Sequence, residues 1–296
     1  MSDNSFNSRL ITAICYTTSH LCVGLDPDLK LITPQARYAA ERIVKKAQGT
    51  VSLPGIGSQP SDAVARVSLS EAIALLTQPY VAAFKPNTAF FEGSRTGLAA
   101  LEGLNKFLHN LPGKPITICD AKRGDIGNTS ARYAEAIFTQ WQYDAVTVNP
   151  LMGTDSVEPF LQDPERGVFL LCLTSNPGAS DFLLKNELYK RIAEQAVKWN
   201  TRGNVGLVVG ATRAVHAAAV RAIAPELPLL IPGIGAQGGS LAEILDAIDA
   251  KNNPRFLINA SRTIMAPEMV DGEDYPDAVS AAAQALRDSI NHHLRN

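Results

Sequence analysis

The residues best suited to chemistry stand in the segment Asp120-Ala-Lys122-Arg-Gly-Asp125, directly after the apolar run 116–119. A buried strand has no structural need to end in such charges, because each one costs several kcal/mol in an apolar setting without a partner. Placed together, they offset one another and hold a lysine between carboxylates. Such an arrangement can handle a proton and an anionic substrate, so it indicates an enzyme.

A second lysine, Lys85, lies in the segment Ala83-Phe-Lys-Pro-Asn87, where another apolar run ends. A lysine among apolar residues must find a carboxylate or shift its pKa downward. Two roles stay open for it: a neutral Schiff-base nucleophile, or a permanent cation paired with Asp120. The nearby carboxylates favour the paired cation.

A glycine-rich segment, 232–240, follows an apolar run and precedes a helical pattern; it contains Gln237. Glycines let backbone N–H groups approach an anion, and the amino end of a helix adds its dipole. Arg262 ends the next apolar run and can donate two hydrogen bonds to one phosphate group. The loop alone is a weak signal, but together with Arg262 it predicts a phosphate site.

Eight short apolar or β-branched runs alternate with helical patterns and predict the elements that position these residues. Repeated strand–helix alternation indicates a parallel sheet, and near-continuous apolar strands suit a sheet buried on both faces. We therefore expect an α/β fold, a (β/α)8 TIM barrel, as a single domain over 1–296 with its core at about 20–265. An open doubly wound sheet is less favoured because no G-x-G-x-x-G follows the first strand. The predicted strands are 21–26, 81–87, 116–122, 145–150, 168–174, 205–211, 229–234 and 256–262.

Three segments exceed the barrel minimum. Residues 1–19 resemble an amphipathic helix packed on the fold and lack the layout of a signal peptide. Residues 48–62 are rich in Gly, Ser and Pro and predict a mobile surface insertion in the first crossover. The tail from Asp271 is expected to end in a surface helix over 276–292.

Composition excludes several classes of protein. The formal net charge is −2 and the pI about 6.2, so we expect neither nucleic acid nor an anionic membrane as a partner. Apolar segments stay short of the ~20 residues that cross a bilayer. The four cysteines form no C-x-x-C pair, which favours free thiols in a reducing, cytoplasmic compartment over disulfides or a zinc site. The histidines lie away from the predicted strand ends, which disfavours a histidine base, a Ser-His-Asp triad and a histidine-bound zinc.

Active sites of such barrels form at the carboxyl ends of the strands. Asp26 stands at one of these ends, where it could cap the strand or accept hydrogen bonds from sugar hydroxyls; both readings stay open. The side chains expected at this face are Asp26, Lys85, Asp120, Lys122, Asp125, Ser175, Gln237 and Arg262.

The segment from Asp120 to Thr129 resembles the D-x-K-x-x-D-I-x-x-T pattern of the orotidine 5'-monophosphate decarboxylase family. Phe84-Lys-Pro-Asn87 and the long first crossover resemble its type 2 branch, and segments 174–178 and 232–239 are similar to further family segments. The resemblance spans about residues 20–265. It implies decarboxylation of orotidine 5'-phosphate to UMP in de novo pyrimidine biosynthesis, with neither metal nor cofactor.

The resemblance also implies a catalytic array of Lys85, Asp120, Lys122 and Asp125. In this array Lys122 protonates C6 of the pyrimidine as carbon dioxide leaves. A cation aimed at the developing carbanion is the device that remains when no electron sink or metal is evident. The loop after Gln237 is the candidate lid.

Roles in substrate binding follow from the same resemblance. Lys85 and Asp26 would hold the ribose, Ser175 would contact the pyrimidine, and Gln237 and Arg262 would bind on the phosphate side. The family implies a homodimer with the active site at the interface. The residues matching Asp125 and Thr129 would then come from the second subunit.

Three alternatives stay open. A magnesium-dependent sugar-phosphate decarboxylase could use D-x-K-x-x-D, but it needs a carboxylate where this chain has Lys85, and Glu92 lies seven residues further on. A Schiff-base aldolase could use Lys85 or Lys122. A non-enzymatic phosphosugar-binding protein is disfavoured by the intact set of charges.

Overall fold

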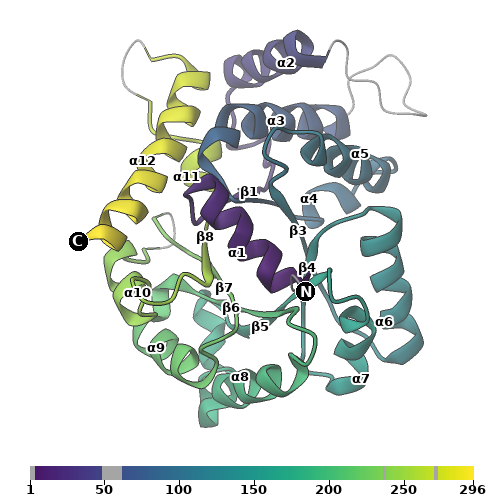
Figure 1. The fold of residues 1–296 in the computed structure, drawn as a ribbon. Coiled ribbons are helices and arrows are strands. Elements are labelled where there is room, and N and C mark those ends of the chain that lie inside the picture. Colours follow the sequence, from purple (N-terminus) through teal and green to yellow (C-terminus); the bar gives the residue numbers. More distant parts are fainter. Residues whose placement is uncertain (1–3, 49–61, 236–237, 270–272) are drawn as a thin grey trace.

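The computed structural model describes residues 4–48, 62–235, 238–269 and 273–296. Within these ranges, eight parallel strands close into a barrel in which each strand pairs with its sequence neighbours and β8 returns to β1. Helices surround the strands, as Figure 1 shows. The predicted (β/α)8 barrel is therefore confirmed, while the division of the chain into one domain stays a prediction.

Each predicted apolar run contains or overlaps a strand. Strands β1, β6 and β8 are buried along their whole length, as a sheet covered on both faces requires. The strands are β1 (Leu21–Leu25), β2 (Ala83–Pro86), β3 (Ile116–Arg123), β4 (Ala145–Val148), β5 (Gly167–Leu173), β6 (Val205–Val209), β7 (Leu229–Pro232) and β8 (Phe256–Ala260).

The helix after β3 begins at Gly127 as α6 and continues as a π-helix, η2 (Glu135–Gln140). Residues 49–61, most of the predicted insertion, lie outside the described residues. No helix in the described ranges has both the length and the apolar character needed to cross a membrane. The longer helices are α1 (Phe6–Thr17), α2 (Pro34–Gln48), α3 (Asp62–Thr77), α5 (Gly97–His109), α6 (Gly127–Ala134), α8 (Leu188–Trp199), α9 (Ala214–Ile223), α10 (Leu241–Ala247) and α12 (Tyr275–Arg295), and the short ones are α4 (Ala89–Glu92), α7 (Thr154–Val157) and α11 (Arg262–Met265).

Helix α1 closes the amino-terminal mouth of the barrel and lies across it in Figure 1. Its buried face, Phe6, Leu10 and Ile14, repeats every four residues and packs into the barrel interior. The rings of Phe6 and Phe169 meet edge to face with their centroids 5.9 Å apart. A Cβ atom at Gly167 would lie 2.3 Å from the Phe6 ring, so the close approach of α1 requires glycine there.

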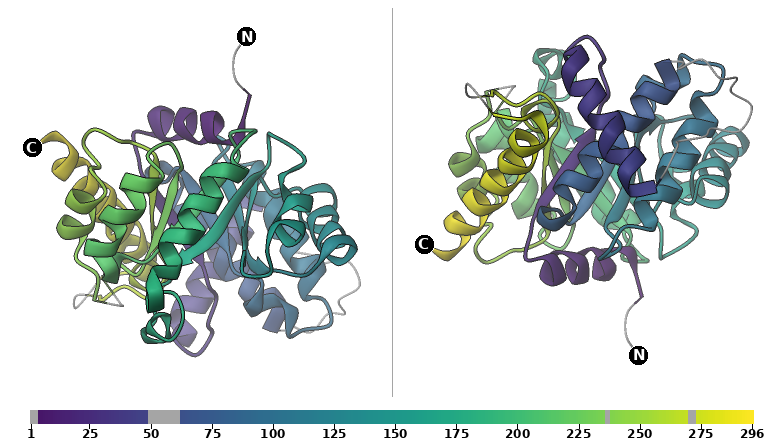
Figure 2. Two further views of the ribbon diagram at one scale, coloured as in Figure 1. Left: turned by 90° about the horizontal axis from the view of Figure 1, so that it is seen from below. Right: turned by 90° about the horizontal axis from the view of Figure 1, so that it is seen from above.

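Helix α12 forms the C-terminal tail that the sequence predicts and packs against α3, α2 and α11 on the outside of the barrel. The two views in Figure 2 show α12 along the side of the barrel and α1 at one end. Ile290 is fully buried, and the Tyr275 hydroxyl donates a hydrogen bond of 2.7 Å to the Met265 carbonyl. The buried Ile290 side chain and the Tyr275 hydrogen bond hold α12 against the rest of the fold.

Asp144, just before β4, ties α1 to the amino ends of the strands. Its carboxylate accepts hydrogen bonds from the Thr117 amide at 2.9 Å and from Arg9 of α1 at 2.7 Å, and His109 lies 3.4 Å away. Burial works to raise the pKa of Asp144, but the hydrogen bonds from His109, Thr117 and Arg9 outweigh it and lower the pKa from 3.8 to about 2.

This lowered pKa predicts a loss of stability in acid. A carboxyl group with a depressed pKa in the folded state stabilises the fold above pH 3.8, and that contribution is lost as the pH falls through about 2. The shift corresponds to about 2 kcal/mol. Urea unfolding at steps from neutral to acid pH should therefore show a steeper loss for the wild type than for Asp144→Asn. Asp288→Asn, at an exposed position, is the control and should keep the wild-type slope. Equal slopes for Asp144→Asn and the wild type would contradict the assignment.

Candidate active site

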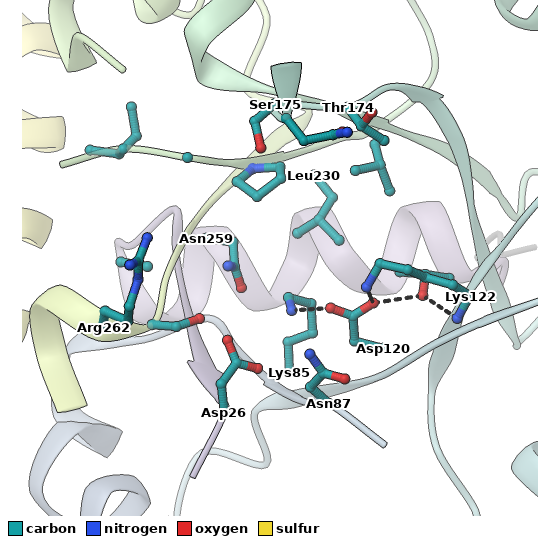
Figure 3. Close-up of a pocket in the computed structure, with 18 of the residues that line it drawn as sticks. Asp26, Lys85, Asn87, Asp120, Lys122, Thr174, Ser175, Leu230, Asn259 and Arg262 are labelled. Carbon is teal, nitrogen blue, oxygen red and sulfur yellow. Dashed lines mark hydrogen bonds and ion pairs between the residues drawn. The ribbon is translucent and has the colours of Figure 1, made fainter. Parts of the chain in front are cut away.

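A cavity of about 480 Å³ opens at the carboxyl ends of the strands, opposite to α1. Strands β2 to β8 contribute residues to its lining and Asp26 lines it just after β1, which is the arrangement expected of a barrel active site. Figure 3 shows charged side chains on its floor and Arg262 across the cavity from them. From the strands and the residues just after them, the lining includes Asp26, Lys85, Asp120, Lys122, Thr147, Ser175, Val208, Pro232, Asn259 and Arg262.

Asp120 is the centre of the charged cluster. Its Oδ2 atom lies 2.5 Å from Nζ of Lys85, and its Oδ1 atom lies 2.5 Å from Nζ of Lys122. The carboxylate is nearly buried, which by itself raises its pKa, but the two lysines overcome burial and hold the pKa of Asp120 well below its usual range. The carboxylate therefore stays ionised between two cations.

Lys85 is the buried cation of the cluster, only 4% exposed at the end of β2. Burial works against its charged form, but the carboxylates of Asp120 and Asp26 more than offset this and raise the pKa of Lys85 above its usual value. Lys85 is thus an ammonium ion paired with Asp120, as the sequence predicts. A Schiff-base nucleophile would need the neutral amine, so the charge state disfavours that role.

Lys122 differs from Lys85 in both exposure and backbone. Its side chain is 51% exposed, and its φ angle is +47°, in the left-handed region that residues other than glycine seldom adopt. In a regular extended strand over the predicted range 116–122, Lys122 and Asp120 would share a face because they are two residues apart. The two side chains do meet, but through an irregularity in β3 and not through regular alternation.

Asp26 points its carboxylate into the same cavity, beside Lys85 (Figure 3). Its Oδ1 atom is buried and has no hydrogen-bond partner among the residues that the structure describes. A buried carboxylate oxygen without a partner carries a desolvation penalty of about 1–3 kcal/mol, which a donor on a bound ligand would remove. Sugar hydroxyls are such donors. The geometry therefore favours a role for Asp26 in binding sugar hydroxyls over a role in capping the strand.

The residues expected to bind phosphate come from two neighbouring strand ends. Arg262 begins α11 directly after β8 and lines the cavity. Gly233 follows β7 with a φ angle of +103°, and the loop returns to pair Gly239 with Ile234. Gln237 and the preceding Ala236 lie outside the described residues. Gly233 and Ile234 of this loop therefore line the cavity together with Arg262 of the neighbouring strand end.

Asp125 and Thr129 are not brought into the cavity by this chain. Oδ1 of Asp125 accepts a hydrogen bond of 2.7 Å from the Ile126 amide, and Thr129 is exposed on α6. Neither residue lines the cavity. The structure thus assembles three of the four charges that the sequence predicts for the array.

Sequence reasoning did not assign Asn87, Thr147 and Asn259 to the site, although all three line the cavity. Thr147 donates a hydrogen bond of 2.9 Å to Oδ1 of Asp120. Asn259 is nearly buried, and its Oδ1 atom lies 3.6 Å from the Cys22 sulfur. The signal available in the sequence is a single polar residue inside an otherwise apolar strand, as in Ala-Val-Thr147-Val and Phe-Leu-Ile-Asn259-Ala.

No group of three or more His, Cys, Asp or Glu side chains suited to holding a metal ion occurs in the described parts of the chain. Three of the four cysteines are buried, and all four are free. Burial raises the pKa of the Cys22 thiol, at the floor of the barrel, to about 12, so Cys22 is an uncharged neighbour of the array.

Comparison with known proteins agrees with this geometry. The model of the "Orotidine 5'-phosphate decarboxylase / HUMPS family" matches residues 19–270. A relative named orotidine 5'-phosphate decarboxylase from Roseiflexus castenholzii is 40% identical over 297 residues, covering 98% of this chain and 99% of the relative. A relative of the same name from Azoarcus sp. is 43% identical over 292 residues, covering 97% of this chain and 98% of the relative.

A solved structure described as Leishmania donovani OMP decarboxylase is also similar. It is 35% identical in sequence, has a TM-score of 0.78, and the match covers 99% of this chain and 100% of that chain. The likeness therefore extends over the barrel, α1 and α12. On these matches, the chain belongs to the orotidine 5'-phosphate decarboxylase family.

Proposed function

We propose that this protein decarboxylates orotidine 5'-phosphate to UMP, a step of pyrimidine biosynthesis, with no metal or cofactor. The observation that carries the proposal is Asp120 ion-paired to both Lys85 and Lys122 on the floor of the cavity, with Arg262 across from them. Curated relatives at about 40% identity bear the name of this activity.

Lys122 is the proton donor in this proposal. The bond between C6 and the carboxylate carbon breaks, its electron pair stays on C6, and carbon dioxide leaves. C6 then takes a proton from Nζ of Lys122, and the half-exposed lysine regains a proton from water. An ammonium ion held in place before reaction stabilises the developing carbanion without reorganisation of solvent.

The remaining residues hold the substrate so that C6 meets Lys122. Asp26 and Lys85 bind the ribose hydroxyls, Ser175 contacts the pyrimidine, and Arg262 with Gln237 binds the phosphate. The phosphate is remote from the bond that breaks, so its binding energy serves positioning. Two observations support these roles: Oδ1 of Asp26 has no hydrogen-bond partner in the described part of the chain, and Arg262 lies beside the β7 loop.

A homodimer completes the site in this proposal, with Asp125 and Thr129 supplied by a second copy. One observation supports it: neither residue lines the cavity of its own chain. The neighbouring Ile126 is 57% exposed, but single exposed apolar residues are common on protein surfaces, so the position of Asp125 and Thr129 outside the cavity carries this part of the proposal. A cytoplasmic location belongs to the same proposal and is supported by the four free cysteines.

Lys122→Ala should abolish turnover while the fold survives. We expect kcat to fall by at least about 10³-fold, because the proton donor and the cation are both lost. The assay follows the loss of the ultraviolet absorbance of the pyrimidine carboxylate, with EDTA present. Arg262→Ala is the matched control and should mainly raise KM, since it removes a phosphate contact remote from C6.

Three results would contradict this mechanism. Full activity of Lys122→Ala would exclude it as the proton donor. Loss of wild-type activity in EDTA, restored by magnesium, would favour the metal-dependent sugar-phosphate decarboxylase. A covalent adduct trapped by borohydride in the presence of substrate would favour the aldolase.

Mixing two inactive variants tests the shared site. Lys122→Ala and Asp125→Ala each lack one residue, and only a mixed dimer contains a site with both native residues. After unfolding and refolding of an equimolar mixture, activity should return to about a quarter of the wild-type level, because half of the dimers are mixed and each has one intact site. Separately refolded variants are the control. Activity of the mixture no greater than the mean of the two would show that Asp125 acts within its own chain or not at all.

A further inference from the structure

We propose that Thr147 is a positioning residue for the decarboxylation: its hydroxyl links the Asp120 carboxylate to the backbone of Lys122 and so places the proton donor. This inference rests on the proposed function and assigns a role to a residue of β4. The Thr147 hydroxyl donates to Oδ1 of Asp120 at 2.9 Å and accepts from the Lys122 amide at 3.0 Å. The residue is 2% exposed and lines the cavity.

The direction of both hydrogen bonds is determined by the partners. The Lys122 amide can only donate, so the Thr147 oxygen is the acceptor in that contact. The hydroxyl has one hydrogen, and the ionised carboxylate of Asp120 can only accept it. The hydroxyl is therefore the one group that satisfies both neighbours, and a methyl group in its place would satisfy neither.

The strand pairing explains why β3 needs this hydroxyl. Cys119 pairs with Val146 and Arg123 pairs with Val148, so three residues of β3 lie opposite Thr147 alone. Such an irregularity interrupts the backbone ladder and leaves amides without their regular partners. The Thr147 side chain supplies the partner for the Lys122 amide.

The same hydrogen bond supports the unusual backbone of Lys122. A residue other than glycine with a φ angle of +47° carries a conformational cost of about 1–3 kcal/mol and persists only where its surroundings enforce it. With the Lys122 amide bonded to β4 and its Nζ atom 2.5 Å from Asp120, the residue is held at both ends. A long side chain that is half exposed would otherwise sample many rotamers.

Thr147→Val tests the hydroxyl because valine keeps the branched shape. We expect kcat to fall about 10- to 100-fold, since a misplacement of the reacting group by about 1 Å has effects of this size. KM should change less than about threefold, because the phosphate contacts are untouched. Thr147→Ser keeps the hydroxyl and should retain kcat within about threefold of the wild type.

A second measurement does not depend on turnover. Exchange of the Lys122 amide hydrogen, followed by NMR, should be at least about tenfold faster in Thr147→Val and unchanged in Thr147→Ser, with the Leu170 amide of β5 as the control. If the wild type fails to turn over orotidine 5'-phosphate but the exchange result holds, the proposed function fails and the hydroxyl link stands without its catalytic role.

The proposal is overturned if Thr147→Val keeps kcat within about twofold of an active wild type, or if valine and serine lower kcat equally. Equal loss would mean that Thr147 acts through its shape. Should Thr147→Val not fold, Thr147→Ala takes its place in the comparison with serine, because alanine removes the hydroxyl without adding volume. An unchanged Lys122 amide exchange in a folded valine or alanine variant would also overturn the link.

Discussion

The ion pair between Lys85 and Asp120 is the interaction on which the site depends. Both side chains are less than a tenth exposed, so neither could remain charged alone at this depth. Removal of either partner would leave the other as a buried, uncompensated charge, which is strongly destabilising. The pair thus keeps a negative charge fixed on the cavity floor, and Lys122 is drawn to that charge from the solvent side.

The barrel brings these charges together because β2 and β3 are neighbours in its parallel sheet. Ala83 pairs with Ile116 and Phe84 with Thr117, and a bridge between Asn87 and Asp120 continues the contact to the strand ends. The opposite mouth is closed by the apolar face of α1 and by the Asp144 network. Stability and chemistry are therefore concentrated at different ends of the same strands, which leaves the carboxyl ends free to carry polar side chains.

Much of the fold could be predicted from the sequence, because eight buried strands produce eight apolar runs and the barrel follows from their alternation with helices. The charges at the strand ends were likewise visible, since ionised residues after an apolar run have few structural explanations. The register between β3 and β4 could not be predicted from the sequence. The irregularity opposite Thr147 and the left-handed conformation of Lys122 depend on how β3 lies against β4. No residue type in Asp120-Ala-Lys122-Arg indicates either feature. Asp125 and Thr129 matched a family pattern, but a pattern does not say which chain's cavity a residue enters.

The left-handed backbone at Lys122 connects these observations. Glycine would adopt that conformation without strain, but glycine has no side chain to donate a proton. The chain keeps a lysine there, so the strain has to be offset by neighbours, and the contacts seen are the ones that could do so: Thr147 on the amide and Asp120 on the ammonium. Strain held in this way by surrounding structure is a common property of functional sites. The irregular strand, the polar residue in β4 and the buried ion pair are then parts of one arrangement, which places a cation where a carbanion would form.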